Sequence, residues 1–600
     1  MVSSATIPEA AKDHILNMAK LGQERYEDFV KERLLVSSKM SIWDTIKKLK
    51  LKTFSSWMDK RTITFGDKVV KLREERQLFV RFLIIQQSRP ELVPKLASSI
   101  GQYEMSVIPR SLFAIDGSLL VCKGKSVLMN IIENLPKVHG SSEIADVIED
   151  LSENPLGKID PDTPPTRVLI VDAMATLQGI KKTPVMTTIK DLKQAFVNNV
   201  LRMAKGYDEF RLIFDHYMEH SLKSKTRLSR ATSSAAASIS YDVHDQMSIK
   251  TLTLKDLLSS SKTKQNLTLL LSLALLDVTA NSSKKFIVSV HDVTKVNIPH
   301  SLDDDMLTHG HEEADTLIPL HIIDTIRHDT FKEIHVRCSD TDVFTFLMDL
   351  DANGYLGTLT KLIMLAGVGA KYREIDIRER VNAVGKTKSA AIVGLHEISG
   401  GDWGGKFVGV SKKSWTESFM ALSDDDPIIE SLTSLGSKPI HNDDLAEPEF
   451  KDLERFVCQV YSKSGPYTLA ALRWELFRSR NLEGEMLPPT LPTLLPHIQR
   501  ASYICMRDKS YALSKPTLPK LDESGWQVHD NNFEPVRCLL PPASKAVFEL
   551  VECVCKLSCD KRCSCMKNDL PCTALCKCYS SGCSNFGGTL VDSQVDLDDS

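Results

Sequence analysis

The sequence predicts an α/β protein built on a mainly parallel sheet. Three short apolar runs, at 168–171, 210–214 and 286–290, have the length and continuity of strands that are buried on both faces. Stretches with helical spacing lie between such runs, and this alternation of strand and helix is typical of a parallel sheet. The first two runs lead directly into Asp172 and Asp215. Because ligands bind beyond the carboxyl ends of parallel strands, these aspartates are candidates for a site.

The composition is that of a globular protein with several domains. The chain has 600 residues, of which 42% are hydrophobic and 26% charged, and its net charge is −3. A net charge this small excludes a polyelectrolyte, so any contact with nucleic acid needs a local basic patch. The first residues lack the charged start and apolar centre of a signal peptide, and the longest apolar stretch, 267–278, is too short to cross a bilayer. We therefore expect an intracellular protein without membrane contact.

Shifts in composition divide the chain into five expected regions. They are a mainly helical N-terminal region with its linker (1–165), the α/β domain (166–420), a helical and Pro-rich extension (421–545), a cysteine-rich module (546–590) and an acidic, disordered tail (591–600). Within the extension we expect an acidic loop at 424–449, helix at 450–478 and an extended Pro-rich segment at 487–496.

Further acidic residues stand at the boundaries of expected elements. Residues 312–315 open a helix, residues 339–342 follow a strand that starts at 334, and a Gly-rich turn at 398–405 carries one more aspartate. Each alone is equally typical of an ordinary helix start, where acidic side chains are favoured. Together they indicate one acidic pocket, made of Asp172, Asp215, Glu313, Asp315, Asp340, Asp342 and Asp402. Helical spacing makes Glu312 the alternative to Glu313.

Such a pocket needs positive charge, because crowded carboxylates repel one another. Hard oxygen ligands without Cys or His favour Mg²⁺ or Mn²⁺. The Gly-rich turn also leads past Lys406 into an expected helix that starts at Lys412 and Lys413. Backbone amides at a helix start hold phosphate well, so these lysines are candidate nucleic-acid contacts. The alternative is an ordinary loop before a surface helix.

Nine of the 14 cysteines fall between positions 553 and 583. In an intracellular chain such clustering indicates metal ligands, and the spacing suits tetrahedral zinc with some sulfurs shared between ions. The expected ligands are Cys553, Cys555, Cys559, Cys563, Cys565, Cys572, Cys576, Cys578 and Cys583.

The order of the acids resembles the flap endonuclease superfamily, a branch of the PIN-like nucleases, over roughly residues 166–420. The matching motifs are Val171-Asp172, Phe214-Asp215, Glu313-Ala314-Asp315, Asp340-Thr341-Asp342 and Gly400-Gly401-Asp402. The chain departs from that family in the 165 residues before the domain and in Asp315, where the family has Glu.

This resemblance implies a PIN-like fold and two divalent ions, Mg²⁺ or Mn²⁺, that serve hydrolysis of a phosphodiester in DNA or RNA. It assigns Asp172, Asp215, Glu313 and Asp315 to one ion, and Asp340, Asp342 and Asp402 to the other. The family also has a Lys and an Arg seven residues apart that reach the scissile phosphate, matched here by Lys223 and Arg230. An exposed basic helix is the alternative for this pair.

The cysteine cluster resembles the CXC domain of the tesmin type, which implies about three zinc ions and contact with DNA. Lys561 and Arg562 are the expected phosphate contacts, although Arg562 stands where that family commonly has a Tyr. A structural or protein-binding zinc knot is the alternative. Nearly the whole chain also resembles animal proteins encoded by multicopy, transposon-associated genes. Taken together, we expect a nuclear, structure-selective nuclease. The alternative is a non-catalytic protein that binds nucleic acid or protein on a PIN-like scaffold.

Overall fold

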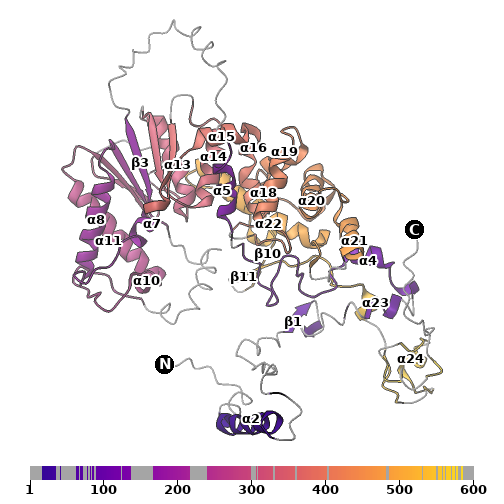
Figure 1. Ribbon diagram of the computed structural model, residues 1–600. Helices are drawn as coiled ribbons and strands as arrows, with labels where there is room; N and C mark the ends of the chain where they lie inside the picture. Colours follow the sequence, from indigo (N-terminus) through magenta and orange to yellow (C-terminus); the bar gives the residue numbers. More distant parts are fainter. Residues whose placement is uncertain are drawn as a thin grey trace. The chain divides into compact units, whose positions relative to one another are not determined.

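The computed structural model (Figure 1) describes most of the chain outside its ends and several connecting segments. The described residues are 16–35, 41, 62–65, 68–71, 166–216, 240–298, 331–357, 361–401, 404–480, 486–529 and 532–548, and most of 78–136, 306–328 and 552–585. The chain divides into two units, Met1–Lys60 and Arg61–Ser600. The first unit contains helix α2 (Met18–Arg33), which confirms that helix is present in the N-terminal region.

The second unit contains a sheet of seven strands in the order β6-β5-β4-β3-β7-β8-β9. The strands are β3 (Arg167–Asp172), β4 (Glu209–Ile213), β5 (Lys285–Val290), β6 (Val293–Val296), β7 (Glu333–Arg337), β8 (Lys361–Ala366) and β9 (Arg373–Asp376). All neighbouring pairs are parallel except those of the two edge strands, β6 and β9. The predicted α/β class with a mainly parallel sheet is therefore confirmed.

Alternate residues of the central strand β3 enter two different cores. Val168 and Ile170 pack with α13 (Ala314–His328) and α14 (Thr341–Ala352) on one face. Leu169 and Val171 face α7 (Ala173–Gln178), α8 (Ile189–Met203) and α11 (Ser261–Thr279) on the other face, where Figure 1 shows α8 and α11 side by side. Because side chains alternate along a strand, an apolar run buries both faces of the sheet.

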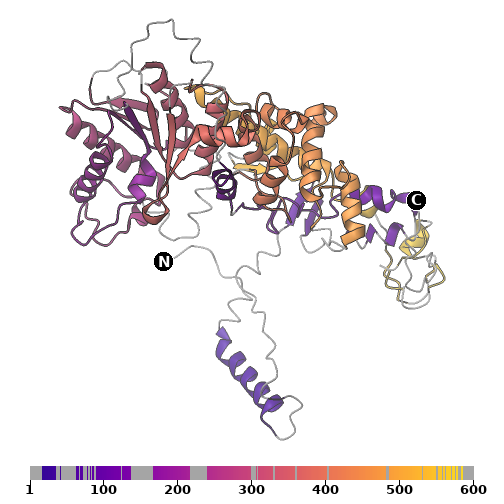
Figure 2. The ribbon, with the colours of Figure 1, turned by 45° about the horizontal axis from the view of Figure 1, so that its top comes forward.

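Helices from residue 377 onward extend the first of these cores beyond the sheet, and Figure 2 shows them gathered together in salmon to orange. They are α15 (Ile377–Val384), α16 (Lys386–Ala390), α17 (Ile392–Ile398), α18 (Lys412–Met420), α19 (Pro427–Ser434), α20 (Pro448–Tyr461), α21 (Leu469–Arg480) and α22 (Leu491–Lys509). Helices α4 (Leu96–Gln102) and α5 (Ser126–Glu133) join the same core. Helix α4 packs on α21, and α5 packs on α14 and α18. Part of the expected N-terminal region thus lies against the α/β domain.

Two expectations for the extension were wrong. The Pro-rich segment is non-helical at 488–490 but helical from Leu491. Pro492 is tolerated in the first turn of α22, where a missing N–H breaks no helical bond, and Pro496 lies inside the helix. Within the expected acidic loop, Asp426 caps α19, and Pro427 is the first residue of that helix. The helices α20 and α21 confirm the helical stretch at 450–478.

The remaining elements are short. They are β1 (Thr62–Phe65), β2 (Lys68–Lys71), η3 (Pro90–Leu92), α10 (Leu254–Leu257), η5 (Gly369–Lys371), η6 (Asn442–Ala446), η8 (Ser510–Ala512), η9 (Leu521–Glu523), β10 (Trp526–His529), β11 (Asn532–Pro535), α23 (Lys545–Phe548) and α24 (Ser564–Lys567). Strands β1 and β2 pair antiparallel, as do β10 and β11. In the described parts of the chain, no helix combines the length and apolar character needed to traverse a bilayer.

Candidate functional site

The candidate site lies where the strand order reverses. From β3 the chain adds β4 and β5 on one side of the sheet, and later adds β7 and β8 on the other side. The carboxyl ends of β4, β3 and β7 are therefore neighbours at one edge. This is the position where open parallel sheets bind ligands.

Two aspartates at this edge also cap helices. Asp172 ends β3, and its Oδ1 accepts hydrogen bonds from the N–H groups of Met174 at 2.8 Å and Ala175 at 3.2 Å. Asp340 follows β7, and its Oδ1 accepts from the N–H of Asp342 at 3.1 Å. Each carboxylate is thus held by the helix that starts there, and its second oxygen is not used in the cap.

Asp215, two residues beyond β4, connects this edge to the start of α13. Its Oδ1 accepts a hydrogen bond from the N–H of Ala314 at 3.0 Å. Glu313 and Asp315 flank that N–H in the chain, so the Glu-x-Asp motif lies beside Asp215. The alternative residue Glu312 meets the same segment through its backbone, because its carbonyl accepts from the N–H of His216 at 2.9 Å.

Electrostatic effects show that four of the predicted acids act at one place. Burial raises the pKa of Asp172 to about 6, and the charges of Asp215 and Asp340 add to the increase. Burial likewise raises the pKa of the Cys338 thiol, with Asp172, Asp315 and Asp340 contributing. The site therefore gathers carboxylates that repel one another.

The donor set fits a hard divalent cation, since it consists of carboxylate oxygens. Among the described residues, however, only cysteines bring three or more ligand atoms within 4.8 Å of one another. The described carboxylates therefore do not form a compact group of three ligand atoms, and repulsion between like charges opposes a closer approach.

Asp342 is engaged differently from the other acids. Its Oδ1 accepts from Nε2 of His396 at 2.8 Å, and its Oδ2 lies 3.4 Å from Nζ of Lys125. Burial acts to raise the pKa of Asp342, but the His396 hydrogen bond and the Lys125 charge hold it well below its usual value. Burial lowers the pKa of His396 to about 4, so a neutral imidazole donates this hydrogen bond at pH 7.

Glu313 also has a basic neighbour that sequence reasoning missed. The side chain of Glu313 is buried. Burial acts to lower the pKa of Arg507 in α22, but the carboxylates of Asp508 and Glu313 raise it. Neither Arg507 nor Lys125 belongs to the motifs of the acid pattern, and no signal in the sequence connects them to it.

The predicted phosphate-binding lysines have different surroundings. Lys412 is buried, and its Nζ donates to the carbonyls of His396 at 2.6 Å and Gly400 at 3.4 Å, unlike the expected surface contact with phosphate. Lys413 is exposed, 3.6 Å from Glu417. Lys406 is partly buried. The predictions for Lys223, Arg230, Asp402 and Lys561 concern positions outside the described residues.

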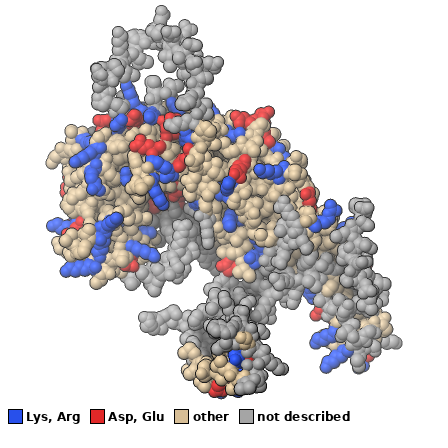
Figure 3. Space-filling view, viewed as in Figure 1, with Lys and Arg blue, Asp and Glu red and all other residues tan. Residues whose placement is uncertain are grey.

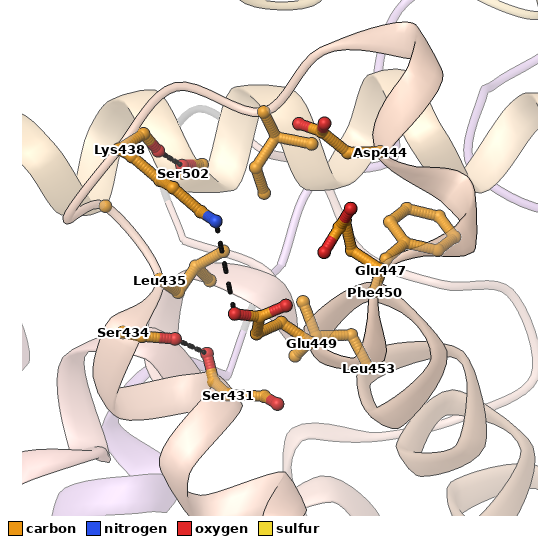
Figure 4. A pocket seen from close by; sticks show the side chains of 12 residues that line it. Ser431, Ser434, Leu435, Lys438, Asp444, Glu447, Glu449, Phe450, Leu453 and Ser502 are labelled. Carbon is orange, nitrogen blue, oxygen red and sulfur yellow. Dashed lines mark hydrogen bonds and ion pairs between the residues drawn. The ribbon is translucent and has the colours of Figure 1, made fainter.

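A hollow of about 460 Å³ has the size of a small-ligand site. Its lining includes Ser339, which precedes Asp340 in the chain, but none of the predicted acids. The lining also includes Arg202 of α8, Arg337 at the end of β7, and Cys338, which follows that strand. Both guanidinium groups can meet phosphate, and Cys338 lies against the acids. A second hollow, between α19 and α20 (Figure 4), is only about 40 Å³. Its ion pair, Lys438–Glu449 at 4.0 Å, is far from any predicted acid in sequence.

The cysteine-rich module brings its sulfurs together in three groups of four. The groups are Cys553, Cys559, Cys563 and Cys572, then Cys553, Cys572, Cys576 and Cys578, and finally Cys559, Cys572, Cys578 and Cys583. Cys572 belongs to all three groups, and neither Cys555 nor Cys565 belongs to any. Four thiolates around one point suit tetrahedral zinc, and the shared sulfurs suit bridging ligands.

Basic side chains surround these sulfurs. Lys556, Arg562, Lys567 and Lys577 are exposed, and Figure 3 shows blue side chains on the visible face of the module. Arg562, one of the predicted phosphate contacts, is paired with Asp560 at 3.0 Å.

No family model matches the chain, and neither does any curated protein. Among solved structures the chain is similar to the catalytic core of Rad2 in complex with DNA substrate. The sequence identity is 11% and the TM-score 0.24, and the match covers 58% of this chain and 92% of that chain.

Proposed function

We propose that this protein is a metal-dependent nuclease that hydrolyses phosphodiesters in DNA or RNA at the carboxyl edge of its sheet. The proposal rests mainly on one observation: Asp172, Asp215 and Asp340 come from three adjacent strands and meet at the point where the strand order reverses. Like charges gathered at such a point are typical of catalytic sites. A DNA substrate would place the protein in the nucleus.

In this proposal, Asp172, Asp215 and Asp340 hold a divalent cation, with Asp315 beside them. Mg²⁺ or Mn²⁺ in such a site supplies positive charge and lowers the pKa of an attacking water. Hydrolysis forms a bond from the water oxygen to phosphorus and breaks the bond to the leaving oxygen, which takes up a proton. Arg202 and Arg337 would orient the phosphates in the neighbouring hollow.

The cysteine-rich module would hold zinc and add affinity for nucleic acid. Its sulfur groups support zinc as the ion, and its exposed lysines support contact with phosphates. Contacts with phosphates do not read the base sequence. They therefore suit a nuclease that selects its substrate by structure, such as a flap or hairpin.

The test is digestion of labelled flaps, hairpins and duplexes, in DNA and RNA, with Mg²⁺ or Mn²⁺. We expect the wild-type protein to cleave at least one of them, and Asp340→Asn to be slower by about 100-fold or more, as when a catalytic electrostatic group is lost. Asp443→Asn, which changes an exposed acid of η6, is the matched control and should retain full activity. Absence of cleavage with every substrate and both ions would disprove the proposal.

A non-catalytic binding protein on a PIN-like scaffold is the second candidate. The engagement of Asp342 by Lys125 and His396 favours it, because that acid is already neutralised. If this candidate is correct, nucleic-acid or protein binding survives Asp340→Asn and no cleavage accompanies it.

A further inference from the structure

We infer that the ammonium group of Lys125 takes the place of a second divalent ion on Asp342, so that the acid site holds one divalent cation and not two. The inference rests on the proposed function only in requiring that the acids bind such a cation. It replaces the expected ion on Asp340, Asp342 and Asp402 with a side chain from outside the 166–420 domain.

The first argument is that both oxygens of Asp342 already have partners. Oδ1 accepts a hydrogen bond from His396, and Oδ2 faces the ammonium group of Lys125. A divalent ion on this carboxylate would have to compete with the ammonium group of Lys125 at Oδ2, because the two positive charges would repel each other.

The second argument is that these partners are built into the fold. His396 is buried within α17, and its carbonyl accepts a hydrogen bond from the buried Lys412. Lys125 stands at the start of α5, a helix that packs on both α14 and α18. A cation that replaced Lys125 would therefore have to move a side chain anchored by a packed helix.

The third argument is that Asp340 and Asp342, two acids of the same motif, have different partners. Asp340 caps α14 with its Oδ1 at the carboxyl edge of the sheet, whereas Asp342, two residues away, is paired with Lys125 and His396. The charge that a second ion would provide is thus present as the ammonium group of Lys125. The Lys125 side chain is 21% exposed, so a phosphate oxygen at the site can reach it.

The experiment counts Mn²⁺ ions on the full-length, zinc-loaded protein by electron paramagnetic resonance and titration calorimetry. We expect one Mn²⁺ per wild-type chain and no spectrum of two coupled ions. Lys125→Met, which keeps most of the side-chain length but removes the charge, should bind a second Mn²⁺. Lys413→Met changes an exposed lysine of α18 as the matched control and should still bind one.

A second pair of variants tests the inference independently, in case Lys125→Met does not fold. Asp342→Asn should keep its single Mn²⁺ within about threefold of the wild-type affinity, because Asp342 is not a ligand, whereas Asp340→Asn should lose that ion. Two coupled ions on the wild-type protein, or a single ion on folded Lys125→Met, would overturn the inference and leave the proposed function intact. A wild-type chain that binds no Mn²⁺ would overturn both.

Discussion

At the level of single side chains, Asp340 and Asp342 show how position in a helix separates two similar residues. Asp340 caps α14 and faces the carboxyl edge of the sheet, while Asp342 lies in the first turn and meets His396 and Lys125. Residues two apart on a helix point in different directions. Chemical similarity along the chain therefore does not make the two acids equivalent.

The raised pKa of Asp172 predicts how stability depends on pH. In the metal-free protein the carboxyl favours its protonated form, so its stabilising contribution is present below pH 3.8 and is lost as pH rises through about 6. We expect Asp172→Asn to raise the metal-free melting temperature at pH 7.5 by ~2–4 °C, and to have little effect near pH 4. Asparagine also caps helices well, so the cap of α7 is kept. Differential scanning calorimetry measures both values.

Addition of Mn²⁺ provides the control for this prediction. At pH 7.5 it should stabilise the wild-type protein more than Asp172→Asn, because the variant lacks one carboxylate ligand. A variant that melts below the wild type at pH 7.5 without metal would contradict the predicted repulsion.

At the level of helices, packing decided the role of the start of α18. The Gly-rich turn and Ser411 begin the helix as expected, and the Ser411 side chain accepts from the N–H of Ser414. Helix α18 packs against α5, α17 and α20, so its first residue is buried. Of these two adjacent lysines, Lys412 is therefore buried and Lys413 is exposed.

This difference predicts opposite results for two neighbouring substitutions. Lys412→Met leaves the carbonyls of His396 and Gly400 without their donor and should destabilise the fold by about 2 kcal/mol or more. Lys413→Met should change stability by less than about 0.5 kcal/mol. Urea unfolding followed by tryptophan fluorescence measures both. Weaker nucleic-acid binding by Lys412→Met with unchanged stability would instead support the phosphate contact expected from the sequence.

Across the molecule, the Arg61–Ser600 unit combines two kinds of stabilisation. One hydrophobic core joins the sheet to α4, α5 and the helices after residue 377. The cysteine-rich module has few large apolar side chains, and its buried cluster consists of cysteines. Modules of this size without an apolar core usually need disulfides, a metal or oligomerisation, and the grouped sulfurs of this module could hold a metal.

The shared sulfurs predict which cysteine matters most. Cys572→Ser should lose most of the bound zinc, because Cys572 belongs to all three sulfur groups, whereas Cys555→Ser should lose the least. Zinc released on denaturation and measured with a colorimetric chelator gives the content per chain, with about three ions expected for the wild type. Equal losses from the two variants would contradict this arrangement of ligands.

The local pattern of the sequence was enough for the class of the fold and for the two strands that lead into Asp172 and Asp215. Short continuous apolar runs such as 168–171 are typical of strands covered on both faces, and an aspartate after each of two adjacent parallel strands lies at their shared edge. Tertiary packing alone decided which groups surround each charged side chain. Lys125 and Asp342 are 217 positions apart, and their contact follows from how α5 packs on α14. Burial likewise separated Lys412 from Lys413, because solvation depends on all the elements that cover a side chain and not on its neighbours in the chain.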